Sequence, residues 1–174
     1  GCTVSDCSLR EAVIEANVDP NAYNDIRLAA ATYQVNGTPL PVTGGTRFQG
    51  VGNTQTLIRG DGITDVMTFS SGQQLDLINL GIDAMGKREL LATNDNRVSL
   101  YRIRAPNPLG TIEAREPDEA GGIGGSFSIG ESEIRATIIC VDKRRCATFD
   151  SSIARLRVYG TGGIFGANVT EVSM

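Results

Sequence analysis

The chain has 174 residues, the size of one ordinary domain, and its 40% hydrophobic and 21% charged residues exclude a disordered chain. It has no histidine, which excludes His-based catalytic triads and His-ligated zinc, and its net charge of −4 argues against nucleic acid as a partner. With 21 glycines and only 5% aromatic residues, the composition favours turn-rich β structure over a helical bundle. We expect a single domain over 1–174 with no membrane span, since no apolar run approaches the ~18 residues required.

The first predicted element is a short helix after residue 8. Ser8 is suited to the N-cap, Glu11 follows three residues later as in a capping box, and apolar residues recur at helical spacing from Leu9 to Ala16. Asn17 and Asp19-Pro20 then predict its end. We expect residues 1–20 to form a disulfide-closed loop followed by this helix.

From residue 26 onward the pattern changes to short apolar and β-branched runs, each closed within a few residues by Gly, Asn, Asp or Ser. Related couplets of strands recur at steps of about 23, 36 and 20 residues, as in a solenoid. The long middle step predicts a projecting loop at 106–125, which contains three prolines, several acids and a glycine run. The longer predicted strands are 75–82, 97–105, 133–141 and 153–159.

Regularly spaced short strands are also typical of a β-sandwich, but the hairpin signals are missing. Asn36-Gly37 leads into a stretch broken by proline, and Asp61-Gly62 leads into Ile63-Thr64, so neither joins two alternating strands. Pairing each strand with its counterpart one repeat later would bury the apolar residues in parallel sheets. The sequence therefore predicts an all-β fold, a right-handed parallel β-helix with a short N-terminal capping α-helix.

The four cysteines form two close pairs, Cys2 with Cys7 and Cys140 with Cys146. Local pairing predicts two disulfides and hence an oxidising, extracytoplasmic compartment. Neither spacing is that of a CxxC motif and no histidine is present, so we expect no metal site and no cofactor. The alternative is that the cysteines are buried thiols, above all Cys140, which ends the apolar run 136–140.

Residues 7–12, Cys-Ser-Leu-Arg-Glu-Ala, spell a six-residue string, and residues 25–28, 56–62 and 75–80 follow it in a matching order. In these features the segment 1–83 resembles the CSLREA-domain family. The resemblance implies a secreted or cell-surface right-handed parallel β-helix of the pectate-lyase-like type, with the N-terminal helix capping the coils. It implies little about activity, because members of the family are mostly large surface or adhesin-like proteins. Beyond residue 84 the chain resembles the family only in its general pattern of β-helix coils.

The two ends of such a stack are expected to differ. A helix laid across the first coil would cover its unpaired backbone groups and its apolar interior, so Arg10 and Glu11 are expected to have structural rather than catalytic roles. Residues 163–174 show no such cap and end in a strand-like run. The last strand is therefore expected to offer an open edge through which copies could associate into a homo-oligomer or polymer.

Five arginines occupy outward positions on the predicted strands and would form a ladder if the repeats stack in register. Acidic residues are expected near its margins: Asp76, Asp83, Glu133, Asp142 and Asp150. Such a ladder could bind an acidic polysaccharide through bidentate contacts. The alternative is a solvated face that protects the sheet from aggregation. The candidate glycan-binding residues are Arg102, Arg104, Arg135, Arg155 and Arg157.

Two weaker patterns are noted. Arg59-Gly60-Asp61 is an integrin-type tripeptide, but it lies in a predicted turn. Residues 94–96, and Asp61 with Asp65, offer oxygen ligands for calcium without EF-hand spacing, and we expect them to form Asx turns instead.

No acid/base constellation stands out among these residues, although a glycosidase would need two suitably spaced carboxylates. The function expected from the sequence is a non-catalytic extracellular module, structural or adhesive surface material that self-associates end to end into a fibre. The alternative is a β-helix that binds or cleaves acidic polysaccharide, as a lyase or hydrolase. Either function predicts a secreted or cell-surface location.

Overall fold

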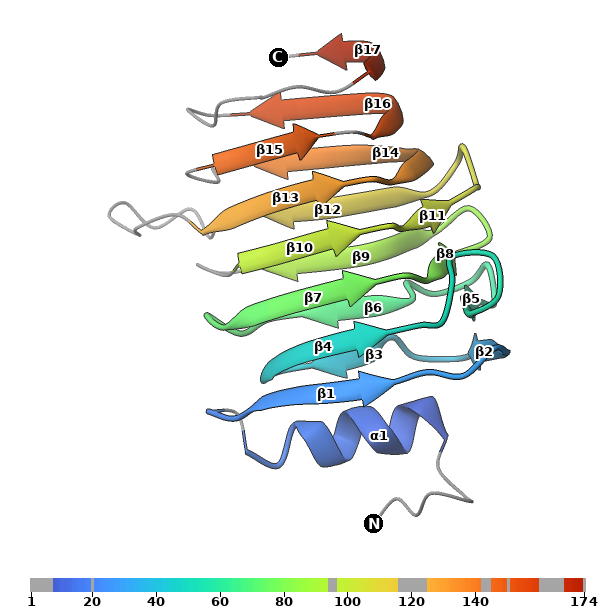
Figure 1. Ribbon diagram of the computed structural model, residues 1–174, viewed down its shortest axis with the longest axis vertical. Coiled ribbons are helices and arrows are strands. Elements are labelled where there is room, and N and C mark those ends of the chain that lie inside the picture. The colour runs from blue at the N-terminus through green and yellow to red at the C-terminus, as the bar shows by residue number, and fades with distance from the viewer. Residues whose placement is uncertain are drawn as a thin grey trace.

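The computed structural model describes residues 8–19, 21–93, 97–115, 125–141, 145–149, 151–159 and 168–173. In these ranges one helix precedes a succession of short strands (Figure 1). The elements are α1 (Leu9–Ala16), β1 (Tyr23–Arg27), β2 (Thr32–Val35), β3 (Leu40–Val42), β4 (Gly45–Gln49), β5 (Leu57–Gly60), β6 (Met67–Phe69), β7 (Gln74–Ile78), β8 (Gly81–Asp83), β9 (Arg88–Thr93), β10 (Arg97–Tyr101), β11 (Arg104–Ala105), β12 (Thr111–Arg115), β13 (Ser126–Gly130), β14 (Glu133–Val141), β15 (Arg145–Phe149), β16 (Ser152–Tyr159) and β17 (Asn168–Ser173).

The strands stack in coils, and every described strand pairs in parallel with its counterpart in an adjacent coil. Coil 1 contains β1, β2 and β3, coil 2 contains β4, β5 and β6, coil 3 contains β7, β8 and β9, and coil 4 contains β10, β11 and β12. Coil 5 contains β13 and the long strand β14, which pairs with both β11 and β12, and coil 6 contains β15 and β16. Figure 1 shows α1 lying across the first coil and the coils rising from it as a solenoid.

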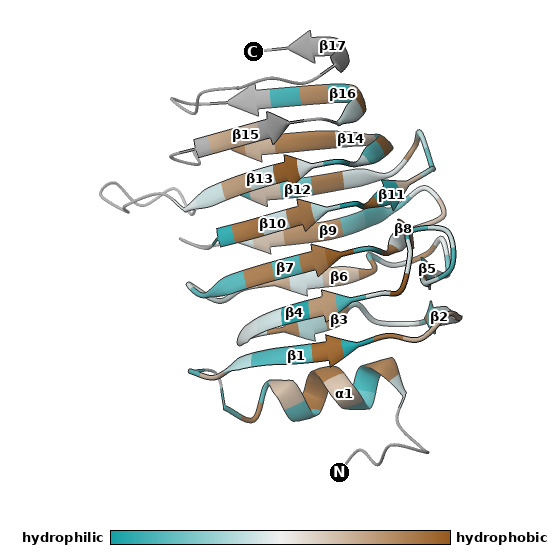
Figure 2. Ribbon diagram, viewed as in Figure 1, coloured by the Kyte–Doolittle hydropathy of each residue, from teal (hydrophilic) through white to brown (hydrophobic). Residues whose placement is uncertain are grey.

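The core lies between the sheets because alternate residues of each strand point inward. In the six-stranded first sheet (β1-β4-β7-β10-β13-β15), Ile26, Phe48 and Leu77 occupy equivalent inward positions, continued upward by Leu100 and Ile129. All of these side chains are buried, and brown segments recur at the same place along β7, β10 and β13 in Figure 2. Each such side chain stabilises the fold by roughly 1.5–3 kcal/mol.

The corners between the first sheet and the next strand repeat from coil to coil. Asn79, Arg102 and Glu131 directly follow β7, β10 and β13 and have positive φ values of 54°, 54° and 47°. The backbone ladder continues through these corners, since the N–H of Asn79 donates to the carbonyl of Tyr101 at 3.0 Å and the N–H of Arg102 to that of Gly130 at 3.0 Å. The chain thus turns without losing hydrogen bonds between coils.

The structure confirms an all-β fold of parallel strands with one N-terminal helix. The long strands expected over 75–82 and 97–105 are each broken at a corner, because Asn79 and Arg102 adopt the left-handed conformation. No described helix is long and apolar enough to cross a membrane.

The predicted loop at 106–125 is wrong for residues 111–115. These residues form β12, which pairs with β9 and with β14 and so completes coil 4. The prolines and acids around this five-residue strand obscured it, and its burial does not alternate, because Ile112, Glu113 and Ala114 are all buried. Because β12 was overlooked, the middle step of the repeat was misplaced: Arg97 pairs with Ser126, and Glu133 pairs with Arg104. Residues 116–124 lie outside the described ranges.

Candidate functional site

The N-terminal helix is anchored by its own first turn and by its apolar face. The backbone N–H of Glu11 donates to the Ser8 hydroxyl at 3.2 Å, and the Ser8 backbone N–H donates to the Glu11 carboxylate at 2.8 Å, which confirms the predicted capping box. Leu9, Val13 and Ala16 are buried against the first coil. Hydrogen bonds from Ser8 lower the pKa of Glu11.

Two polar side chains of this helix and its C-cap cover the open edge of coil 1. Arg10 donates to the carbonyls of Pro39 at 3.1 Å and Thr38 at 2.5 Å. Asn17 donates from Nδ2 to the carbonyl of Pro41 at 2.5 Å, and its Oδ1 accepts from the N–H of Thr43 at 2.9 Å.

The Asn17 amide therefore pairs with the chain at β3 as the backbone of a neighbouring strand would. The contacts made by Arg10 and Glu11 confirm the structural roles predicted for them. Asn17 was recognised from the sequence only as a helix stop, because its partners lie more than twenty residues along the chain.

The five candidate arginines do not form one ladder. Arg102 lies at the corner after β10, and Arg104 lies on β11 next to Glu133 of β14. Arg135 falls where the register between β14 and β16 shifts. Arg155 pairs with Thr137 and Arg157 with Ile139, so neither stacks directly on another candidate arginine.

Two of these arginines are joined to carboxylates of the next coil. Arg102 Nε lies 2.8 Å from Glu131 Oε2 and its guanidinium lies 5.1 Å from the centre of the Tyr101 ring, while the Tyr101 hydroxyl also donates to Glu131. The hydrogen bonds from Tyr101 and Arg102 lower the pKa of Glu131. Arg104 Nε lies 3.7 Å from Glu133 Oε2. Arg155 donates to the carbonyl of Pro108 in the coil below β14.

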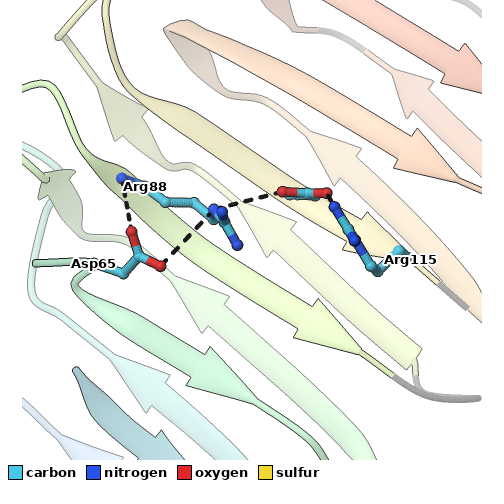
Figure 3. A network of polar contacts seen from close by, with 4 residues as sticks. Asp65, Arg88 and Arg115 are labelled. Atoms are coloured by element: carbon cyan, nitrogen blue, oxygen red, sulfur yellow. Dashed lines mark hydrogen bonds and ion pairs between the residues drawn. The ribbon is translucent and has the colours of Figure 1, made fainter. Parts of the chain in front are cut away.

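A second set of charges, not recognised from the sequence, crosses three coils on the outside of the second sheet, the 11-stranded sheet of order β2-β5-β8-β11-β14-β12-β9-β6-β3. Figure 3 shows Arg88 of β9 between Asp65 and the partner that it shares with Arg115. That partner is Glu113 of β12, whose side chain is only 6% exposed. Arg88 Nε lies 3.9 Å from Asp65 Oδ2 and 3.4 Å from Glu113 Oε2, and Arg115 Nε donates to Glu113 Oε1 at 2.8 Å. The network is electrically balanced, with two cations and two anions.

The acidic residues expected beside the arginines are dispersed. Asp76 lies on β7 in the first sheet, where it is buried and accepts hydrogen bonds from the Tyr23 hydroxyl and, at 2.9 Å, from Gln74 Nε2. Burial raises the pKa of Tyr23 to about 12, and the hydrogen bond to Asp76 adds to the rise. Asp83 accepts from the N–H of Met85 at 2.9 Å. Asp142 and Asp150 lie outside the described residues.

The Arg59-Gly60-Asp61 tripeptide contacts its own coil, the coil before it and the coil after it. Asp61 accepts hydrogen bonds from the N–H groups of Gly37, Ile63 and Thr64 at 2.8–2.9 Å, as an Asx turn requires, and these bonds hold its pKa well below the usual range. The guanidinium of Arg59 lies 3.1 Å from the Met85 sulfur. Within the described part of the chain no group of three or more potential metal ligands occurs, and residues 94–96 lie outside it.

The predicted disulfide between Cys140 and Cys146 is not formed. Both are buried thiols, Cys140 on β14 opposite Ala114 and Cys146 on β15 opposite Phe127, in different sheets. Cys140 occupies an inward position of the alternating strand β14, and Cys146 lies opposite the buried Phe127, so these cysteines fill the core as small apolar residues. Cys2 and Cys7 lie outside the described residues.

No family model matches the chain, and neither a curated protein nor a solved structure is significantly similar to it.

Proposed function

We propose that this chain is a non-catalytic structural or adhesive module of the extracellular surface. The observation that carries the proposal is the use made of its outward charges, which join adjacent coils. Asp25 pairs with Arg47 between coils 1 and 2, and Arg88 with Asp65 between coils 2 and 3. This series of ion pairs between adjacent coils continues up to coil 5 with Arg88–Glu113, Arg102–Glu131 and Arg104–Glu133. Side chains used in this way stabilise the stack of coils rather than take part in a reaction.

The proposal includes the finer description of the fold as a right-handed parallel β-helix of the CSLREA type. Parallel strands joined by crossovers within one sheet are right-handed in about 98% of cases. The described residues of the six-residue string all have places in the cap: Ser8 and Glu11 form the capping box, Arg10 binds the chain before β3, and Leu9 and Ala12 pack on the core. A secreted or cell-surface location rests on this resemblance and on the proposed Cys2–Cys7 disulfide.

Self-association is proposed to occur through β17. This strand pairs in parallel with β16, and no described strand pairs with its other edge. Coil 1 is covered by α1, so strand pairing between copies would join them at β17 rather than head to tail. Closed pairs of molecules are therefore favoured over the fibre expected from the sequence.

Sedimentation of the 174-residue chain over a range of concentrations tests this association. Successive N–H groups of a strand point to opposite edges, so Glu171→Pro and Val172→Pro remove donors from different edges of β17. We expect wild-type dimers, and one of the two variants to be folded and monomeric while the other loses stability. A wild-type chain that sediments as a monomer at every concentration rejects self-association.

A glycan-binding function is the second candidate, favoured by two arginines of β14 and β16 that remain exposed, Arg135 and Arg157. It predicts salt-sensitive retention on an acidic polysaccharide column that the Arg135→Ala/Arg157→Ala variant loses. Arg104→Ala is the matched control, because Arg104 is paired with Glu133. Equal retention of the double variant and wild type dismisses this function. Release of unsaturated or reducing sugars from the column material would instead support an enzyme.

A further inference from the structure

One carboxylate faces the interior of the solenoid. Glu89 is 0% exposed, and neither of its oxygens has a hydrogen-bond partner of normal geometry among the described residues. Most buried carboxylates are paired or hydrogen-bonded, because an isolated buried charge is strongly unfavourable. The side chain therefore calls for a physical explanation.

A β-bulge accounts for its inward direction. Thr111 of β12 pairs with Arg88 and Ile112 pairs with Leu90, so Glu89 is the extra residue of β9. As a result Glu89 and Leu90 are both buried, although neighbouring residues of a regular strand point to opposite faces. The carboxylate lies against Gly110, where a Cβ atom would be 1.8 Å from Glu89 Oε1. Glycine at this position leaves the space that the carboxyl group occupies.

The charged groups around Glu89 do not neutralise a negative charge there. Asp83, at the end of β8, disfavours ionisation of Glu89 through space. Arg88 on β9 is engaged with Asp65 from the turn before β6 and with Glu113 of β12, and Arg115 of β12 binds Glu113 as well. Lys87 lies in the turn before β9, and β6 contains only Met, Thr and Phe.

We propose that Glu89 is protonated in the folded protein and makes its stability pH-sensitive, so that ionisation of this side chain weakens the contact between coils 3 and 4. The neutral carboxyl group fits a site that offers burial without a counter-ion. The ionised group would have to remain there unpaired or leave the core, and either outcome disturbs the corner that contains Gly110. This role is independent of the proposed surface function.

The direction of the effect follows from the two states. Desolvation raises the pKa of Glu89 from 4.5 to about 7, Asp83 adds to the rise, and the N–H groups of Glu89, Thr111 and Ala84 oppose it. Below the pKa of Glu89 in the unfolded chain, both states hold the proton and no stability is lost. As the pH rises from the unfolded-state pKa to the folded-state pKa, the unfolded chain releases the proton first, so the free energy of unfolding falls. Above the folded-state pKa the loss of stability is complete.

Urea unfolding at about pH 5 and about pH 8 tests the proposal with wild type, Glu89→Gln and Glu133→Gln. Between these pH values the wild-type unfolding equilibrium constant is expected to rise, relative to that of Glu89→Gln, by on the order of 100-fold. Glu133→Gln is the control, because Glu133 is an exposed, ion-paired glutamate. It should keep the wild-type dependence. A ratio between wild type and Glu89→Gln that does not change with pH overturns the proposal.

If Glu89→Gln fails to fold, the wild type still decides the question. In protein labelled with ¹³C at glutamate carboxyl carbons, one resonance should titrate with a midpoint near pH 7, well above the value of about 4.3 for glutamate in model peptides. The absence of any glutamate resonance with a midpoint above about pH 6 contradicts the proposal.

Discussion

Gly50 and Gly52 occupy neighbouring positions after β4 but meet different surroundings. A Cβ atom at Gly50 would lie 2.5 Å from the backbone oxygen of Asn79 and 2.8 Å from Cβ of Thr56. At Gly52 the nearest atom is the flexible amide end of Gln55 at 3.1 Å. Only the first of these glycines is required by the approach of two coils.

Gly50→Ala is therefore expected to destabilise the protein by about 1–3 kcal/mol, because the backbone of coil 3 must shift to admit the methyl group. Gly52→Ala, the matched control, should change stability by no more than about 0.5 kcal/mol, since the Gln55 side chain can turn away. Urea unfolding followed by circular dichroism measures both values. Equal effects of the two substitutions would contradict the close contact between Gly50 and Asn79.

The cysteines provide a second prediction for individual residues. Cys140 and Cys146 are buried thiols, and we propose a disulfide between Cys2 and Cys7. Alkylation in denaturant without reductant should therefore modify two of the four cysteines, and mass spectrometry should place both labels at 140 and 146. In the native protein these two thiols should be protected by burial. Four labels would rule out the N-terminal disulfide, and labels confined to Cys2 and Cys7 would mean that Cys140 and Cys146 are bonded.

Among the secondary-structure elements, α1 covers the end of coil 1, and this role can be tested by a single substitution. Asn17→Ala removes both hydrogen bonds between the cap and the chain at β3 and leaves the groups of Pro41 and Thr43 without that partner. We expect a loss of about 1–3 kcal/mol in the free energy of unfolding. Glu15→Ala, on the exposed side of the same helix, is the control and should be nearly neutral. An Asn17→Ala variant as stable as Glu15→Ala would mean that the apolar face alone holds the helix.

Local signals were enough to predict α1, since the capping box and the apolar spacing from Leu9 to Ala16 act within two turns. The parallel stacking could also be predicted, because apolar alternation and missing hairpin turns are visible along the chain. The corners at Asn79 and Arg102 could not, since their left-handed conformation is imposed by the neighbouring coils.

The candidate site was less predictable for the same reason. Whether Arg104 meets an arginine or Glu133 depends on register, and the overlooked strand β12 displaced the step that joins residues 97–105 to residues 126–134. To predict the network around Glu113 or the bulge at Glu89, one would have to know the pairing registers of two neighbouring pairs of strands at once. No residue pattern within a single strand marks either of them.

At the scale of the whole molecule, the strands of each coil pair only with strands of the coils directly below and above it in the described chain. In such a one-dimensional stack, a local defect is felt mainly by nearest neighbours, and parts of the structure can open separately. The charge pairs follow the same rule, because the Glu113 network joins coils 2, 3 and 4 without reaching coil 1. The ends of the solenoid should therefore respond independently to changes made far apart.

Hydrogen exchange resolved by peptide tests this independence with two variants. Glu113→Gln weakens the ion pairs with Arg88 and Arg115 and should accelerate exchange in β9, β12 and their neighbours by about 10-fold, while β1 and β3 keep wild-type rates. Asn17→Ala should give the reverse pattern, with faster exchange in β1 to β3 and unchanged rates in β9 and β12. Uniform acceleration of every strand in both variants would show that the solenoid opens only as a single cooperative unit, since a local defect would then lower the stability of all coils equally.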